Sequence, residues 1–379
     1  MTTVPVSEVA TETSSVGACL AQWLQSILPG ADADSVRVAR LGPVEVGHSA
    51  EILLADFEWR VDGGQCGQQA VIRRRPPAPG LLEPYDLGKQ FAILQGLEAT
   101  GVRSPRPLWL ESTGTVLGQE FYVMERVAGS VYKTNVPYEV TTDQARIRRM
   151  TESLVEQIAA VHRVDLAGTG LHRLADGSDP LEREIDHWSA EVRRVQRGPL
   201  PALEQLICAV RSEMPPPDER LGPSLVHGNP KPGNFAFNDA GEVTALFNWD
   251  LATVGDPMTD IGWMEWMWRY PDCFTRLPAS LSVEQFIAMY ERLTGHSTRY
   301  RPWYRALAGL KLVVILLVGS MLFDAGHTDD LRFADMAQGI HPLTARALRQ
   351  LHRDARMYSG PVLPRPERVE QVRGRVAAQ

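Results

Sequence analysis

The sequence predicts an α+β protein with a small β-rich lobe that carries one helix and a larger, mostly helical lobe. Short β-favouring apolar segments separated by turn residues occupy Val36–Val127. From Thr141 onward, apolar residues recur at the spacing of amphipathic helices. The pattern breaks at Ala128-Gly129. We therefore expect the two lobes to comprise residues 16–128 and 129–358.

The first lobe is expected to be an antiparallel sheet with one inserted helix, Tyr85–Thr100, which ends at Gly101. A loop over Val61–Gly67, containing Asp62-Gly63-Gly64, is typical of a hairpin turn. Residues 1–15 are expected to be disordered, and a short helix should follow at Gly17–Leu28. The predicted strands are Val36–Leu41, Glu51–Arg60, Gln68–Arg75, Arg106–Leu110 and Gln119–Val127.

The second lobe is expected to be helical except for one hairpin at Phe235–Phe247. The apolar run Leu312–Phe323 is well short of the roughly 20 residues that span a bilayer, so a buried helix is expected there. Residues 359–379 should form a flexible basic tail. The predicted helices are Gln144–Arg163, Leu181–Gln196, Pro201–Met214, Met258–Tyr270, Val283–Leu293, Tyr300–Phe323, Leu331–Gly339 and Pro342–Tyr358.

Composition narrows the classes of protein. The chain has 379 residues, of which 44% are hydrophobic and 22% charged, as in a globular protein with a sizeable core. A net charge of −7 argues against nucleic-acid and membrane-surface partners. The four cysteines form no CxxC pair, and the N-terminus lacks the basic-then-apolar layout of a signal peptide. A cytoplasmic location is expected, and the many arginines beside four lysines suggest a GC-rich bacterial genome.

Polar residues gather at both ends of the predicted hairpin, within the segment Leu225–Asp260. Because a hairpin brings its two ends together, we expect these side chains to converge on one site. The residues are His227, Asn229, Lys231 and Asn234 before the hairpin, and Asn248 and Asp250 after it.

The motifs HGNPKPGN and FNWD resemble the His-Gly-Asp-x-x-x-x-Asn loop and the Asp-Trp-Glu motif of aminoglycoside phosphotransferase-like enzymes. The branch they most resemble is the kinase-like domain found beside acyl-CoA dehydrogenases. The resemblance runs from Val36 to about Arg346 and includes VIRRRPPAPG, EFYVMERVAG, DLATVGDPMTDIGW and YRALAGLKLVVI. It implies a protein-kinase-like bilobal fold with a site for ATP and Mg²⁺.

For the nucleotide, the resemblance implies a loop over the phosphates, a basic residue paired with a helix residue, and a hinge that binds adenine. From the residues alone, the loop after Val44 has one glycine and is more typical of an ordinary turn than of a phosphate-binding loop. The matching positions are Gly47, His48 and Ser49 for the loop, Arg73 and Gln90 for the pair, and Glu125 and Val127 for the hinge.

For the chemistry, Asn229 stands at the position of the catalytic carboxylate and Asn248 at that of a metal-binding aspartate. Asn234 keeps the metal-binding asparagine, and Asp250 replaces the usual glutamate. His227 and Asp260 match residues that brace the loop. An amide takes no proton near neutral pH, and Mg²⁺ favours anionic oxygens. With Gln90, three family carboxylates are amides, so we expect a weakened or lost ATP–Mg²⁺ site.

Several roles stay open. Lys231 either binds an anion or polarises a carbonyl, or it is a solvated loop lysine. His227 either catalyses or braces its loop, and Asp250 acts either as an acid–base group or through structural hydrogen bonds. Trp263, Glu265 and Trp266 line a substrate pocket or belong to the core.

Three functions follow as hypotheses. The cleft binds or transforms a small organic molecule without phosphorylating it, or the protein is an active ATP-dependent small-molecule phosphotransferase, or it is a regulatory pseudokinase.

Overall fold

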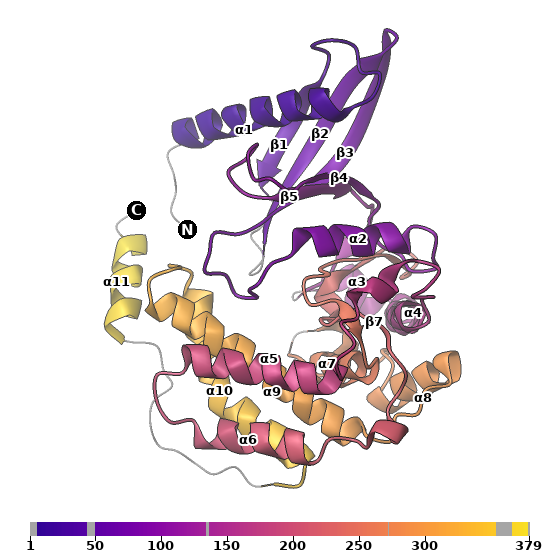
Figure 1. Ribbon diagram of the computed structural model, residues 1–379, viewed down its shortest axis with the longest axis vertical. Coiled ribbons are helices and arrows are strands. Elements are labelled where there is room, and N and C mark those ends of the chain that lie inside the picture. The colour runs from indigo at the N-terminus through magenta and orange to yellow at the C-terminus, as the bar shows by residue number, and fades with distance from the viewer. Residues whose placement is uncertain (1–5, 44–49, 134–135, 272, 354–365, 378–379) are drawn as a thin grey trace. The chain divides into compact units, whose positions relative to one another are not determined.

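The structure, a computed structural model, describes residues 6–43, 50–133, 136–271, 273–353 and 366–377 (Figure 1). The expected phosphate loop at Gly47, His48 and Ser49 lies outside these residues. The chain forms two compact units. Unit 1 comprises Met1–Gln95, Pro105–Val127 and Arg373–Gln379, and unit 2 comprises Gly96–Ser104 and Ala128–Val372.

Unit 1 is built on a five-stranded antiparallel sheet in the order β1-β2-β3-β5-β4. The β2–β3 turn is shorter than predicted. Val61 already pairs with Gly64, and the two residues between them have φ values of 51° at Asp62 and 78° at Gly63. Such a turn matches the twist of the two strands. The elements are α1 (Val6–Ile27), β1 (Arg37–Pro43), β2 (Glu51–Val61), β3 (Gly64–Arg74), α2 (Leu87–Leu97), β4 (Pro107–Glu111) and β5 (Phe121–Glu125).

Helix α1 covers one face of this sheet (Figure 1). Leu20 and Leu24 are fully buried against strand residues such as Phe57 and Ile72. The helix starts at Val6, so the prediction of disorder over residues 1–15 is wrong from Val6 onward. The sequence pattern located the part from Gly17 onward, which carries Leu20 and Leu24.

Unit 2 is mainly helical, with α9 as its central helix. Helix α9 packs against α5, α6, α7 and α10. It alone among the described helices is long and apolar enough to cross a membrane, but 78% of its most apolar window is buried inside the structure. The helices are α3 (Tyr138–Thr142), α4 (Gln144–His162), α5 (Pro180–Val195), α6 (Pro201–Ser212), α7 (Met258–Trp268), α8 (Val283–Thr294), α9 (Arg301–Asp324), α10 (Leu331–Gln350) and α11 (Pro366–Ala377).

Two C-terminal predictions are wrong. We expected separate helices at Leu331–Gly339 and Pro342–Tyr358, but α10 runs through Pro342 as one helix. The buried face of α10, including Ile340 and Thr344, packs on α9. This packing stabilises α10 as one helix although Pro342 has no N–H to donate.

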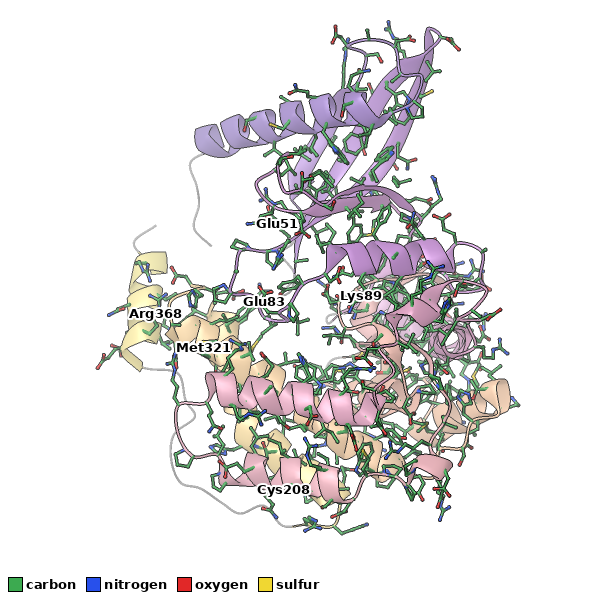
Figure 2. All side chains as sticks on the ribbon, in the orientation of Figure 1. Glu51, Glu83, Lys89, Cys208, Met321 and Arg368 are labelled. Carbon is green, nitrogen blue, oxygen red and sulfur yellow. The ribbon has the colours of Figure 1, made fainter. Side chains whose placement is uncertain are left out.

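We also expected a flexible tail over residues 359–379, yet Pro366–Ala377 forms α11. Arg368 forms an ion pair with Asp329 and lies 5.6 Å from the ring centroid of Phe323. Figure 2 shows Arg368 on α11 beside the helix that carries Met321. Val372 is buried. These contacts hold a segment whose composition alone predicts mobility.

Candidate functional site

The polar residues flanking the hairpin lie together at one end of two small sheets in unit 2. Strands β8 (Phe235–Phe237) and β9 (Val243–Leu246) pair as the predicted hairpin, and β6 (Ser130–Val131) adds to the β8 edge. Strands β7 (Ser224–Val226) and β10 (Thr253–Gly255) form the second pair. The loops meet where Phe247 N–H donates to the Asn234 carbonyl at 2.8 Å.

His227 is buried, and both of its ring nitrogens are engaged within the loops. Nε2 donates to the Phe247 carbonyl at 2.9 Å, and Nδ1 accepts the Asn229 N–H at 3.1 Å. Burial lowers the pKa of His227 to about 4, so the ring is neutral near pH 7. Of the two roles left open by the sequence, this arrangement favours bracing.

Asp260 at the start of α7 fixes the same loop. Its two oxygens accept the backbone N–H groups of His227 and Gly228, each at 2.8 Å, and one also meets His162 Nε2 at 3.1 Å. Burial raises the pKa of the Asp260 carboxyl. The hydrogen bond and charge of His162 and the contacts with His227 outweigh burial and hold this pKa below its usual range. His162 in turn lies 2.7 Å from the Tyr290 hydroxyl. A buried polar network with its members engaged gives the loop one geometry.

Lys311 is a positioning residue that the sequence analysis missed. It is buried in the apolar helix α9 and donates to the Gly228 carbonyl at 2.5 Å. Its ammonium also lies 3.6 Å from Glu184 and 5.2 Å from the ring centroid of Trp263. A lone cation within an apolar run was the available signal, because burying a lysine is costly unless it has partners.

The backbone at position 228 requires glycine. Its φ is +78°, and a Cβ there would overlap the Leu251 carbonyl. A glycine alone combines that backbone conformation with so close an approach.

The asparagines form the polar interior of the site. Asn234 Nδ2 donates to the Asn229 carbonyl at 2.7 Å. Asn229 is 7% exposed, and its Oδ1 is buried without a hydrogen-bond partner. Asn248 adopts φ +70°, which asparagine tolerates better than most residues, and its Oδ1 is also buried without a partner. A native structure seldom leaves such oxygens unpaired, so both oxygens are candidates for a hydrogen bond from a ligand or a water molecule.

The remaining charged candidates differ in their surroundings. Lys231 is half-buried, and burial and then the nearby charge of Lys133 lower its pKa. Asp250 is half-buried and close enough to His227 to act on its charge. Asp256, just before α7, accepts the Met258 N–H at 2.8 Å and also the Tyr304 hydroxyl at 2.6 Å.

The candidate substrate residues lie in the core. Glu265 is 4% exposed and is held by Arg301 at 2.7 Å and Arg305 at 3.0 Å. Trp266 is 4% exposed and donates through Nε1 to the Arg305 carbonyl at 2.6 Å. Trp263 is equally buried, under Lys311. Of the two roles left open by the sequence, pocket or core, this arrangement favours the core, because packing and ion pairs occupy these side chains.

In unit 1 the two residues of the predicted nucleotide-binding pair, Arg73 and Gln90, both neighbour Tyr122. Arg73 on β3 is paired in register with Tyr122 on β5, and the Tyr122 hydroxyl lies 3.4 Å from Gln90 Oε1 on α2. Arg73 and Gln90 are both buried. At the predicted hinge, Glu125 N–H donates to the carbonyl of Arg106. Val127 is the last residue of this stretch of unit 1.

Comparisons with known proteins agree with this architecture. The family model described as "Phosphotransferase enzyme family" matches residues 54–307. Acyl-CoA dehydrogenase family member 11 of Rattus norvegicus is 28% identical over 265 residues, which cover 66% of this chain and 33% of that protein. Family member 10 of Mus musculus is 27% identical over 208 residues, which cover 55% of this chain and 19% of that protein. The chain thus spans a third or less of the length of these relatives.

Solved structures show the same fold. A protein described as an aminoglycoside phosphotransferase, from Ralstonia eutropha JMP134, superposes with a TM-score of 0.70 at 20% identity, covering 89% of this chain and 99% of that one. The GDP complex of aminoglycoside 2′-phosphotransferase-IIIa gives 0.57 at 16% identity, covering 87% and 99%. The predicted kinase-like α+β fold is confirmed.

Proposed function

We propose, from the premise that this chain belongs to the phosphotransferase enzyme family, that it binds or transforms a small organic molecule without transferring phosphate. One observation carries the proposal. Asn229 and Asn248 stand where the family resemblance places the catalytic and metal-binding carboxylates, while the scaffold around them is fully braced.

The donor set does not fit Mg²⁺. This cation is held in nucleotide sites by one or two carboxylates plus phosphate oxygens. Asn234 and Asn248 offer neutral amide oxygens instead. In the described part of the chain, no three His, Cys, Asp or Glu side chains are grouped to hold a metal ion. Asp256 and Asp260 are engaged in holding the backbone.

Among the described residues of the loop, no strong base replaces the missing carboxylate at position 229. His227 is neutral, and its ring nitrogens are occupied by Phe247 and Asn229. General-base catalysis typically contributes about 10²–10⁴-fold, so its loss together with that of the metal leaves little phosphoryl transfer. Asp250 is the remaining carboxylate of the motif.

The experiment measures ATP binding and turnover with Mg²⁺ by the full chain, beside the double variant Asn229→Asp, Asn248→Asp. We expect no turnover by the natural chain, and tighter Mg²⁺-dependent nucleotide binding by the variant. ATP turnover by the natural chain in the ordinary kinase range, about 1–100 per second, would refute the proposal.

An active small-molecule phosphotransferase is the second candidate. It is favoured by the retained Asn234 and by the grouping of Arg73 with Gln90 around Tyr122. Mass spectrometry of candidate alcohols incubated with ATP would distinguish the two: a phosphorylated product supports the second candidate and counts against the first.

A further inference from the structure

Three of the chain's four lysines lie around the loop at residues 229–234. Lys231 is part of that loop, and Lys311 holds the Gly228 carbonyl from α9. Lys133 follows β6, whose residues Ser130 and Val131 pair with Phe237 and Ala236 of β8. A Cβ on Gly233 would lie 3.0 Å from Lys133 Cγ, so the lysine stem packs against the loop backbone.

The charges of Lys231 and Lys133 are not compensated. Within the described residues, neither ammonium has an ion pair or a hydrogen bond, whereas Lys311 has both the Gly228 carbonyl and Glu184. The nearby charge that acts on Lys231 is another cation, Lys133. Two neighbouring cations without a counter-charge favour an anion from solution.

The buried amide of Asn229 is a second, independent sign of a ligand. The residue is 7% exposed, and its Oδ1 has no partner. Asn229 lies two positions before Lys231, and its carbonyl accepts the Lys231 N–H at 2.9 Å. An amide presents a donor and an acceptor, whereas an ionised carboxylate only accepts and repels anions. Asn229 therefore accommodates an anion that an aspartate would exclude.

We propose that this loop is an anion site that works without a metal. The ammonium groups of Lys231 and Lys133 hold the carboxylate or other oxyanion of an organic ligand, and the Asn229 amide bonds a polar group beside it. The inference rests on the proposed function, because it assigns the substrate class of the same loop: organic acids that carry a hydroxyl or similar donor.

The test is titration calorimetry of the full chain in the presence of a chelator. The probes are mandelate, its uncharged counterpart mandelamide, inorganic phosphate and metal-free ATP. We expect mandelate to bind and mandelamide not to bind. Affinity should fall as ionic strength rises. If phosphate or metal-free ATP binds and mandelate does not, the site prefers phosphates, and the assignment to organic acids is overturned.

Variants then locate the site. Lys231→Met should weaken mandelate binding about tenfold or more, and Lys133→Met should weaken it severalfold. Lys231→Arg keeps the positive charge and should therefore retain mandelate binding. Lys89→Met, on α2 of unit 1, is the matched control and should change nothing. Asn229→Asp should weaken binding about tenfold, beyond the effect of Asn229→Ala, because it supplies a competing negative charge. Ligand-free melting temperatures identify any variant that fails to fold.

The outcomes separate the two proposals. Equal affinity of mandelate and mandelamide, no binding of any anion, or undiminished binding by both Lys→Met variants overturns the anion site. Turnover of Mg²⁺-ATP by the natural chain overturns the proposed function, whatever the lysine variants show. Binding of mandelate through the lysine pair without turnover supports both.

Discussion

Acidification should destabilise this fold through His227. The residue is fully buried, and burial lowers its pKa to about 4, against about 6.5 in an unfolded chain. Because the folded pKa is the lower one, the unfolded chain takes up the proton first as pH falls. The stability gained by burying the neutral ring is complete above about pH 6.5 and is lost progressively toward pH 4. At about pH 5 the unfolded residue is almost wholly charged and the folded one is not, so about 2 kcal/mol is lost.

Urea denaturation of the natural chain and of His227→Gln, at several values between about pH 8 and pH 5, measures this effect. The natural chain should lose stability more steeply, by about 1 kcal/mol per pH unit near the lower end. His296, whose pKa burial also lowers, remains in both proteins, so the difference in slope reports His227. His327→Gln, at an exposed residue, should keep the natural slope. Equal slopes for the natural chain and His227→Gln would refute the reasoning.

Three substitutions are tested by their free energy of unfolding: the first two change the support of the loop, and the third changes an ion pair in the core. Gly228→Ala should cost about 3 kcal/mol or more, because the new Cβ would overlap the Leu251 carbonyl. The control Gly177→Ala, at a similar φ of +79° but in open space, should cost about 1–2 kcal/mol. Similar costs for the two variants would contradict the close approach at Gly228. Lys311→Met should cost about 2 kcal/mol, since a charged hydrogen bond to a buried carbonyl is lost, and an unchanged unfolding midpoint would argue against that bond. Glu265→Gln should cost about 3 kcal/mol, because Arg305 loses the carboxylate with which it pairs and Arg301 keeps only that of Glu284; an unchanged free energy of unfolding would contradict the role of these ion pairs.

Local patterns predicted the sheet of unit 1 and most helices of unit 2. Strands β2 and β3 alternate in burial along much of their length, and Asp62-Gly63 favours a tight turn between them. The convergence of Asn234 and Phe247 also followed from sequence, because a hairpin with polar ends has few other arrangements. These features depend on residues close together in the chain.

The errors concern contacts between distant residues. The helical state of α11 depends on Val372 and on Arg368, which meets Asp329. No local pattern indicates that Glu265 would be held by arginines 36 and 40 positions later. The same is true of Lys311, which meets a carbonyl 83 positions earlier. In each case a partner that is distant in the sequence decides whether a charged side chain is solvent-exposed or engaged in the fold. The periodicity of apolar residues does not reveal such a partner.

The braced loop shows why the charges of this site can change without loss of the fold. Asp260 holds the N–H groups of His227 and Gly228, and Lys311 holds the Gly228 carbonyl, so the backbone on which residue 229 stands is fixed by groups other than residue 229 itself. Replacing a carboxylate by an amide of the same shape at position 229 alters the local charge but none of these bonds. Geometry and charge are therefore separable here. A scaffold shared with phosphotransferases can present cation-binding oxygens or, with Lys231 left uncompensated, a site for an anion.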